Sequence, residues 1–153
     1  MNLSRQLGEV WERYIRVECD ELDRRGDAFV SKNHEAPPVP GKKTKRAKSK
    51  PDFSGVIRGG RHVVFDAKST LEYNRLDLKN IAKHQLEHLR RCDELGGIAF
   101  VYVLSGERRK FVVSVSVIDA AKGASVRLDC DQVFEKMPGE TWFDVVERWQ
   151  NAR

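Results

Sequence analysis

The fold of this chain is decided by residues 51–68, which read PDFSGVIRGGRHVVFDAK. Two apolar stretches flank Gly59-Gly60, and paired glycines supply the positive φ angles of a tight hairpin turn. We therefore expect strands over residues 52–57 and 62–68. The second holds a continuous apolar run, Val63-Val64-Phe65, which is typical of a strand covered on both faces. Such a hairpin brings Asp52 towards Asp66 at the end of a central strand.

On both sides of this hairpin, the hydrophobic pattern predicts alternating helices and strands. We expect helices over residues 3–24 and 78–95, strands over 28–30, 98–104 and 111–116, and a C-terminal helix. The first helix should bury one apolar face, formed by Leu7, Val10, Trp11, Tyr14, Val17 and Leu22. The order predicts a single α/β domain over residues 1–153, in which helices flank a mixed central β-sheet.

The composition is that of one globular domain, with 153 residues, 40% hydrophobic and 33% charged. No apolar run approaches the length of a membrane span, and the N-terminal order of residues is not that of a secretion signal. We therefore expect a cytoplasmic protein with no membrane contact. Its cysteines are widely spaced, which favours free thiols over zinc or a disulfide; they are Cys19, Cys92 and Cys130.

A basic segment over residues 35–50 interrupts the pattern with prolines and clustered positive charge, and predicts a flexible loop. It is either an ordinary solvated loop or, as we favour from its place just before Asp52, a DNA-binding one. The net charge of the chain is +5. The residues expected to contact DNA are Lys42, Lys43, Lys45, Arg46, Lys48 and Lys50.

Asp52, Asp66 and Lys68 together are the residue types that phosphodiester hydrolysis needs. Carboxylates bind hard divalent cations through oxygen, and such a cation lowers the pKa of water and shields the phosphate. A lysine beside them can orient or help to deprotonate that water. The alternative is a surface hairpin with scattered charge. An unpaired charge at the end of a buried strand costs several kcal/mol, which favours a functional site.

Three blocks of sequence resemble the PD-(D/E)xK nuclease superfamily and, within it, the RecU-type Holliday junction resolvases. They are Gly8-Glu9-Val10-Trp11-Glu12, the hairpin from Pro51 to Lys68, and the helix that begins Leu78-Lys79-Asn80-Ile81 and continues to His84-Gln85 and His88. The resemblance implies a restriction-endonuclease-like fold. It also implies a homodimer that resolves four-way (Holliday) DNA junctions by paired symmetric nicks, each leaving a 5′-phosphate.

By this resemblance, Mg2+ is the cofactor, with Mn2+ able to substitute. Its ligands are Asp52, Asp66 and the backbone carbonyl of Ala67, and Lys68 positions the water. Glu12 adds an acid from the first helix, and Gln85 reaches the site or the adjacent phosphate. Glu9 and Glu18 compete with Glu12 for that role, and Gln85 is alternatively a boundary residue at the edge of an apolar stripe.

The chain departs from the family pattern at two places. Asp66 stands where these resolvases commonly use glutamate, and the region of residues 36–50 is short and basic where relatives carry a projecting stalk. The host, a bacterium or a phage-infected cell, stays open. So do two rival functions: a nuclease of this superfamily with another target (restriction, flap or repair), and a non-catalytic DNA-binding module.

Two further patterns have less specific interpretations. His84 and His88 have the spacing of helical zinc ligands, but no third ligand accompanies them, so we expect solvated or phosphate-contacting histidines. Tryptophans can stack on unpaired bases, but helical periodicity favours core packing or a subunit interface for all three, which are Trp11, Trp142 and Trp149.

Overall fold

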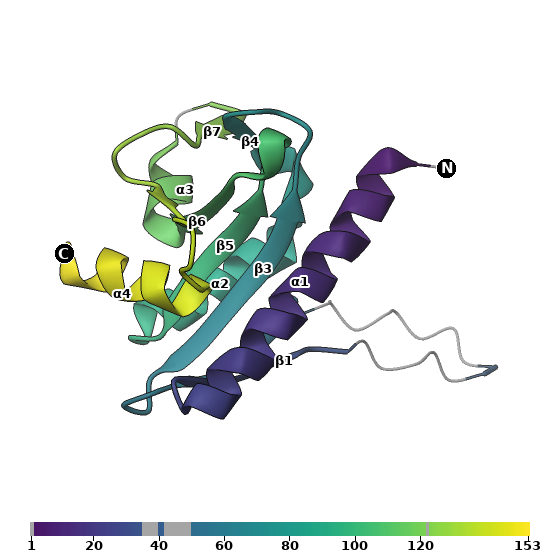
Figure 1. The fold of residues 1–153 in the computed structure, drawn as a ribbon. Helices are drawn as coiled ribbons and strands as arrows, with labels where there is room; N and C mark the ends of the chain where they lie inside the picture. Colours follow the sequence, from purple (N-terminus) through teal and green to yellow (C-terminus); the bar gives the residue numbers. More distant parts are fainter. Residues whose placement is uncertain (1, 35–39, 42–49, 122) are drawn as a thin grey trace.

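A computed structural model describes residues 2–34, 40–41, 50–121 and 123–153 (Figure 1). A mixed sheet lies between helices, with a smaller two-stranded sheet beside it. The elements, in chain order, are α1 (Leu3–Arg25), β1 (Ala28–Lys32), β2 (Phe53–Ile57), β3 (His62–Ser69), β4 (Arg75–Asp77), η1 (Leu78–Asn80), α2 (Lys83–Glu94), β5 (Ile98–Leu104), η2 (Gly106–Arg108), β6 (Lys110–Ser114), α3 (Val115–Ala120), β7 (Ser125–Arg127), β8 (Phe134–Glu135) and α4 (Trp142–Asn151).

The main sheet has the strand order β1-β2-β3-β5-β6-β8, with β3 and β5 parallel and every other neighbouring pair antiparallel. The predicted hairpin is confirmed: β2 and β3 pair from Phe53–Phe65 to Val56–His62. Gly59 and Gly60 take φ values of 96° and 90° at the turn, as the paired glycines predicted. The ladder thus stops at Phe53, and Asp52 lies just beyond its end.

Helices cover both faces of β3. On one face, α1 and α4 pack over Val63 and Phe65; on the other, α2 and α3 pack over Val64. Figure 1 shows α1 running along β3 on the near side, with α2 behind the sheet. The continuous apolar run of the sequence therefore belongs to a central strand covered on both faces, as predicted. Since successive side chains alternate, Asp66 and Lys68 share the α2 face with Val64.

Stacked aromatic rings fill the core on the α1 face. The rings of Phe53, Phe65 and Phe100 stack with centroids 5.1 and 4.7 Å apart, and Trp142 lies tilted against Phe65. Trp11 donates its indole N–H to the Tyr102 carbonyl at 3.1 Å. All three tryptophans are buried, so the prediction that they pack in the core is confirmed.

The buried face of α1 differs from the predicted one. Its buried side chains are Trp11, Ile15, Glu18, Cys19 and Leu22. Val10 and Val17, expected to face inward, are 57% and 63% exposed. The error arose because apolar residues occupy two adjacent stripes of this helix, and the sheet covers only one of them.

Two predicted boundaries are also wrong. The helix expected over residues 78–95 is a short 3-10 turn, η1, followed by α2, because Ile81 and Ala82 are extended. The strand expected over residues 111–116 ends at Ser114, whose side chain accepts a hydrogen bond from Val117 N and caps α3.

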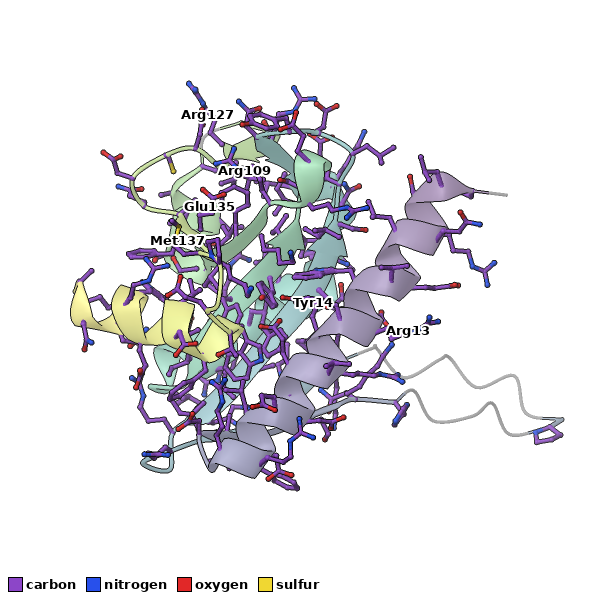
Figure 2. All side chains as sticks on the ribbon, viewed as in Figure 1. Arg13, Tyr14, Arg109, Arg127, Glu135 and Met137 are labelled. Atoms are coloured by element: carbon purple, nitrogen blue, oxygen red, sulfur yellow. The ribbon has the colours of Figure 1, made fainter. Side chains whose placement is uncertain are left out.

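β8 is short and is held to the sheet by side chains as well as by its ladder. Arg109 and Glu135 form a two-pronged ion pair with nitrogen–oxygen distances of 2.8 and 2.9 Å. Figure 2 shows the two labelled side chains next to each other at the β6–β8 edge.

In the described ranges, no helix is both long and apolar enough to cross a membrane. The three cysteines are free thiols.

Candidate active site

The hairpin joins Asp52 to the end of β3 through a pair of reciprocal hydrogen bonds. Asp52 N donates to Asp66 Oδ1 at 3.2 Å, and Ala67 N donates to Asp52 Oδ2 at 2.8 Å. These bonds take the place of the ladder, which has already ended at Phe53. The structure therefore brings together the two carboxylates that the sequence singled out.

Asp66 is fully buried, and only one of its two carboxylate oxygens accepts a hydrogen bond. Its Oδ2 lies 3.0 Å from the Nζ of Lys68, but no hydrogen bond of good geometry reaches that oxygen. Lys68 itself is about one-fifth exposed, which leaves its ammonium group at the border with solvent. A buried anionic oxygen without a hydrogen-bond donor costs free energy, so a lone pair there is available to a cation.

Asp52 is destabilised as an anion. Its burial, followed by a hydrogen bond to Asp66 and the Asp66 charge, raises the pKa of Asp52 to about 7, although the Ala67 N–H and Lys68 act in the opposite direction. Carboxylates forced together in this way are a recurrent property of functional sites. A bound cation would relieve their repulsion.

The donor set at this point consists of oxygen atoms. Ala67 N points to the side of β3 where Asp52 lies, and the carbonyl of a strand residue points to the same side as its N–H. The Ala67 carbonyl therefore faces the edge occupied by Asp52. Two carboxylates and a carbonyl suit a hard divalent cation, so these residues fit the group that the sequence predicted.

Gln85 lies in the first turn of α2, on the helix that covers the Asp66 face of β3. Its side chain is 9% exposed, and its Oε1 has no hydrogen-bond partner. An amide oxygen without a partner is unusual in an apolar layer, where Leu89 one turn later is fully buried. This polar group is thus held on the same side of the sheet as the carboxylates.

The three candidate glutamates of α1 interact with residues other than Asp52 and Asp66. Glu12 forms an ion pair with Lys32 of β1, and Glu9, which is 61% exposed, pairs with Arg5. Glu18 accepts hydrogen bonds from Tyr102 at 2.9 Å and from Trp142 N at 3.0 Å, so it is a core residue.

Within the described ranges, no group of three His, Cys, Asp or Glu side chains could hold a metal. The structure therefore does not join Glu12 to Asp52 and Asp66, nor does it build a zinc site on His84 and His88. A contribution of Glu12 to catalysis stays a prediction.

Of the basic residues expected to contact DNA, the structure describes Lys50, which is exposed. Burial, followed by the charges of Lys50 and His62, lowers the pKa of His88 in α2. Lys50 therefore acts on the helix that covers the Asp66 face. The others lie outside the described residues: Lys42, Lys43, Lys45, Arg46 and Lys48.

Asn33, directly after β1, was not predicted from the sequence as a site residue. It contacts both Pro51 and Asp52. The only available signal was its place between a predicted strand and the basic segment, and this signal does not identify the contacts.

A family model described as "RecU: Recombination protein U" matches residues 28–127, which include β1, the hairpin, α2 and β5. The match covers more than half of the chain and contains Asp52, Asp66, Lys68 and Gln85. The chain belongs to the RecU family. The resemblance noted from the sequence blocks is thereby confirmed.

Individual RecU relatives match over shorter stretches. Holliday junction resolvase RecU from Limosilactobacillus reuteri (strain DSM 20016) is 43% identical over 58 residues, which is 38% of this chain and 28% of the relative. The protein of the same description from Lacticaseibacillus casei (strain BL23) is 44% identical over 52 residues, or 34% of this chain and 24% of that one. The matched stretches thus span about a quarter of these relatives.

The fold is also that of a solved structure, the resolvase Hjc from Archaeoglobus fulgidus. The two superpose with a TM-score of 0.51 and 16% sequence identity, over 80% of this chain and 88% of that one. The predicted class, a restriction-endonuclease-like mixed sheet flanked by helices, is confirmed.

Proposed function

We propose that this RecU-family chain is an Mg2+-dependent endodeoxyribonuclease that resolves four-way DNA junctions by paired symmetric nicks. One observation carries the proposal: the buried Asp66 Oδ2 has no hydrogen-bond donor, although Lys68 Nζ lies 3.0 Å away and Asp52 is hydrogen-bonded to the same carboxylate. This arrangement is costly in an inert hairpin and useful at a metal site.

Asp52, Asp66 and the Ala67 carbonyl would hold the cation. When bound, Mg2+ lowers the pKa of water and neutralises charge on the scissile phosphate. Mn2+, which accepts the same oxygen ligands, should substitute for it.

Groups of the protein itself would orient the water, the phosphate and the Asp52 carboxylate. Lys68 keeps a cationic group at the border with solvent, where it can orient the attacking water or bind a phosphate oxygen. The Gln85 Oε1 lies without a partner on the same face, and this amide can hydrogen-bond that water or the phosphate next to it. The Ala67 N–H fixes the direction of Asp52.

A four-way junction as substrate is supported by the family and by the names of the relatives, each a Holliday junction resolvase. Two identical sites related by a twofold axis match a substrate that needs two symmetric nicks, so we propose that a homodimer is the active form. Recognition would rest on backbone charge and branch shape, with a contribution from the basic segment of residues 35–50, which precedes Asp52 in the sequence. The setting would be the cytoplasm of a bacterial or phage-infected cell.

The decisive test of catalysis replaces the two groups that define the site. Asp52→Asn and Lys68→Ala should abolish Mg2+-dependent cleavage of a synthetic junction while its binding, measured by gel shift, changes by less than about threefold. Asp20→Asn, on the exposed surface of α1, is the matched control and should cleave normally. Absence of Mg2+-dependent cutting by the parent chain would instead favour a non-catalytic binding module.

Substrate choice is tested separately by competition. An unlabelled four-way junction should displace a labelled one far better than linear duplex of equal length does. Equal displacement by both would overturn the junction assignment and favour a nuclease of this fold with another target.

A further inference from the structure

Asn33 lies at the end of β1, where the paired part of the β1–β2 ladder has already stopped at Lys32 and Phe53. Its backbone N–H donates to the Asp52 carbonyl at 2.7 Å, and its side-chain Nδ2 donates to the Pro51 carbonyl at 2.8 Å. One residue therefore binds the carbonyl that precedes the Asp52 Cα and the carbonyl that follows it.

The Asn33 side chain is itself oriented. Ser54 Oγ donates to Asn33 Oδ1 at 3.0 Å, which leaves the Nδ2 group directed at Pro51. Both oxygen and nitrogen of the amide are thus used, and the assignment of the two atoms follows from their partners. Ser54, Asn33 and Pro51 form a short chain of hydrogen bonds that ends one residue before Asp52.

Asp52 depends on these contacts because it has few others: its N–H donates to Asp66 Oδ1, and its Oδ2 accepts from Ala67 N. It precedes β2, lies outside the β2–β3 ladder, and is next to a proline that has no N–H to donate. Pro51 is buried, so its carbonyl needs a donor, and Asn33 provides it. Without that side chain, fewer contacts oppose the repulsion between Asp52 and Asp66, and the Asp52 carboxylate can shift from the position that it now holds.

We propose that Asn33 is a positioning residue that presets the Asp52 carboxylate for the divalent cation, acting through the Pro51 carbonyl and not by touching metal or DNA. The inference rests on the proposed nuclease function. Residues that orient metal ligands typically change metal affinity by about 10- to 100-fold when they are removed. Asn33 should therefore control the affinity for the cation more than the rate of the step that follows.

The test is a Mg2+ titration of junction cleavage by the full chain. For Asn33→Ala, the Mg2+ concentration at half-maximal rate should rise about tenfold, while the rate at saturating Mg2+ stays within about threefold and the KM for DNA does not change. Ser54→Ala should give a smaller shift in the same direction. In the Asn33→Ala background, Ser54→Ala should add nothing, because both act through one hydrogen-bond chain.

Val30→Ala is the control for general destabilisation. It truncates a buried residue of β1 whose side chain packs in the core, so it should lower the melting temperature without moving the Mg2+ dependence. An Asn33→Ala protein that melts lower but keeps the parental Mg2+ dependence would overturn the proposal. If Asn33→Ala does not fold, Ser54→Ala decides the question by the same criterion.

Calorimetric titration with Mn2+ in the absence of DNA separates this inference from the proposed function. A parent chain that binds Mn2+ but cleaves no DNA would refute the nuclease and still test Asn33. Weaker Mn2+ binding by Asn33→Ala than by Val30→Ala supports the positioning role. Equal binding by the two variants contradicts it.

Discussion

The Asp52 carboxylate accepts a hydrogen bond from the Ala67 backbone N–H, with 2.8 Å between Oδ2 and N. This bond crosses the gap left where the β2–β3 ladder ends, and it ties a residue outside the sheet to the central strand. It also brings two carboxylates together at the cost of repulsion between them.

Without metal, the Asp52 carboxyl should make stability fall as the pH rises. Its pKa is raised to about 7, chiefly by burial and then by Asp66, so the folded state holds a proton that the unfolded state has released. The penalty is absent below the ordinary carboxyl pKa and complete above about pH 7. Asp52→Asn should therefore stabilise the chelated protein at pH 8 by about 1–2 kcal/mol, and hardly at pH 4.

Thermal unfolding in EDTA at the two pH values measures this difference, with Asp20→Asn as control. Mg2+ should stabilise the parent protein at pH 8 and leave Asp52→Asn unchanged. A parent and variant with parallel pH profiles would contradict the assignment of the raised pKa.

Glu18 should also make the protein less stable as the pH rises through the same range. Burial raises its pKa to about 7, despite hydrogen bonds from Tyr102 and the Trp142 N–H. Glu18→Gln keeps an acceptor for Trp142 N and removes the charge, so it should stabilise the protein at pH 8 by about 1 kcal/mol and have little effect at pH 4. Denaturant unfolding at both pH values tests it; junction cleavage should not change, because Glu18 lies in the core.

Replacing Gln85 should separate function from stability. Its buried Oε1 has no partner, and an unsatisfied group of this kind costs about 1–3 kcal/mol. Gln85→Met, of similar volume, should therefore raise the melting temperature while cleavage falls about tenfold or more. Leu86→Met is the neighbouring control. Normal cleavage by Gln85→Met would show that Gln85 is only a boundary residue at the edge of the apolar layer.

The basic segment should govern the salt dependence of DNA binding. Each phosphate contact contributes about one unit to the slope of log K against log salt concentration. Changing Lys42, Lys43, Lys45 and Arg46 to alanine should weaken junction binding and reduce that slope by about 2–4 units. Exchanging lysine and arginine at the same positions keeps the charge and should keep the slope. An unchanged slope in the alanine variant would exclude the segment from the DNA interface.

The central strand and the carboxylate pair could be predicted from sequence because both depend on local rules. Gly59 and Gly60 fix the turn, the turn fixes the register, and the register brings Asp52 to the end of β3 beside Asp66. The apolar run of β3 likewise requires cover on both faces. These features can be predicted without knowing which distant residues the hairpin contacts.

Other features depend on tertiary contacts that leave no local pattern. Val10 and Val17 are as apolar as the residues that α1 buries, and only the placement of the sheet excludes them from the core. Asn33 acquires its role from Pro51, which the basic segment separates from it in sequence. The ion pair between Glu12 and Lys32 likewise joins two residues from separate elements.

The most direct test of the proposed function is cleavage of a synthetic four-way junction with Mg2+, with the cuts mapped on all strands. We expect paired nicks at symmetric positions on opposing strands, each leaving a 5′-phosphate, with no cleavage by Asp52→Asn or in EDTA. Single or unpaired nicks, or equal cutting of linear duplex, would contradict it.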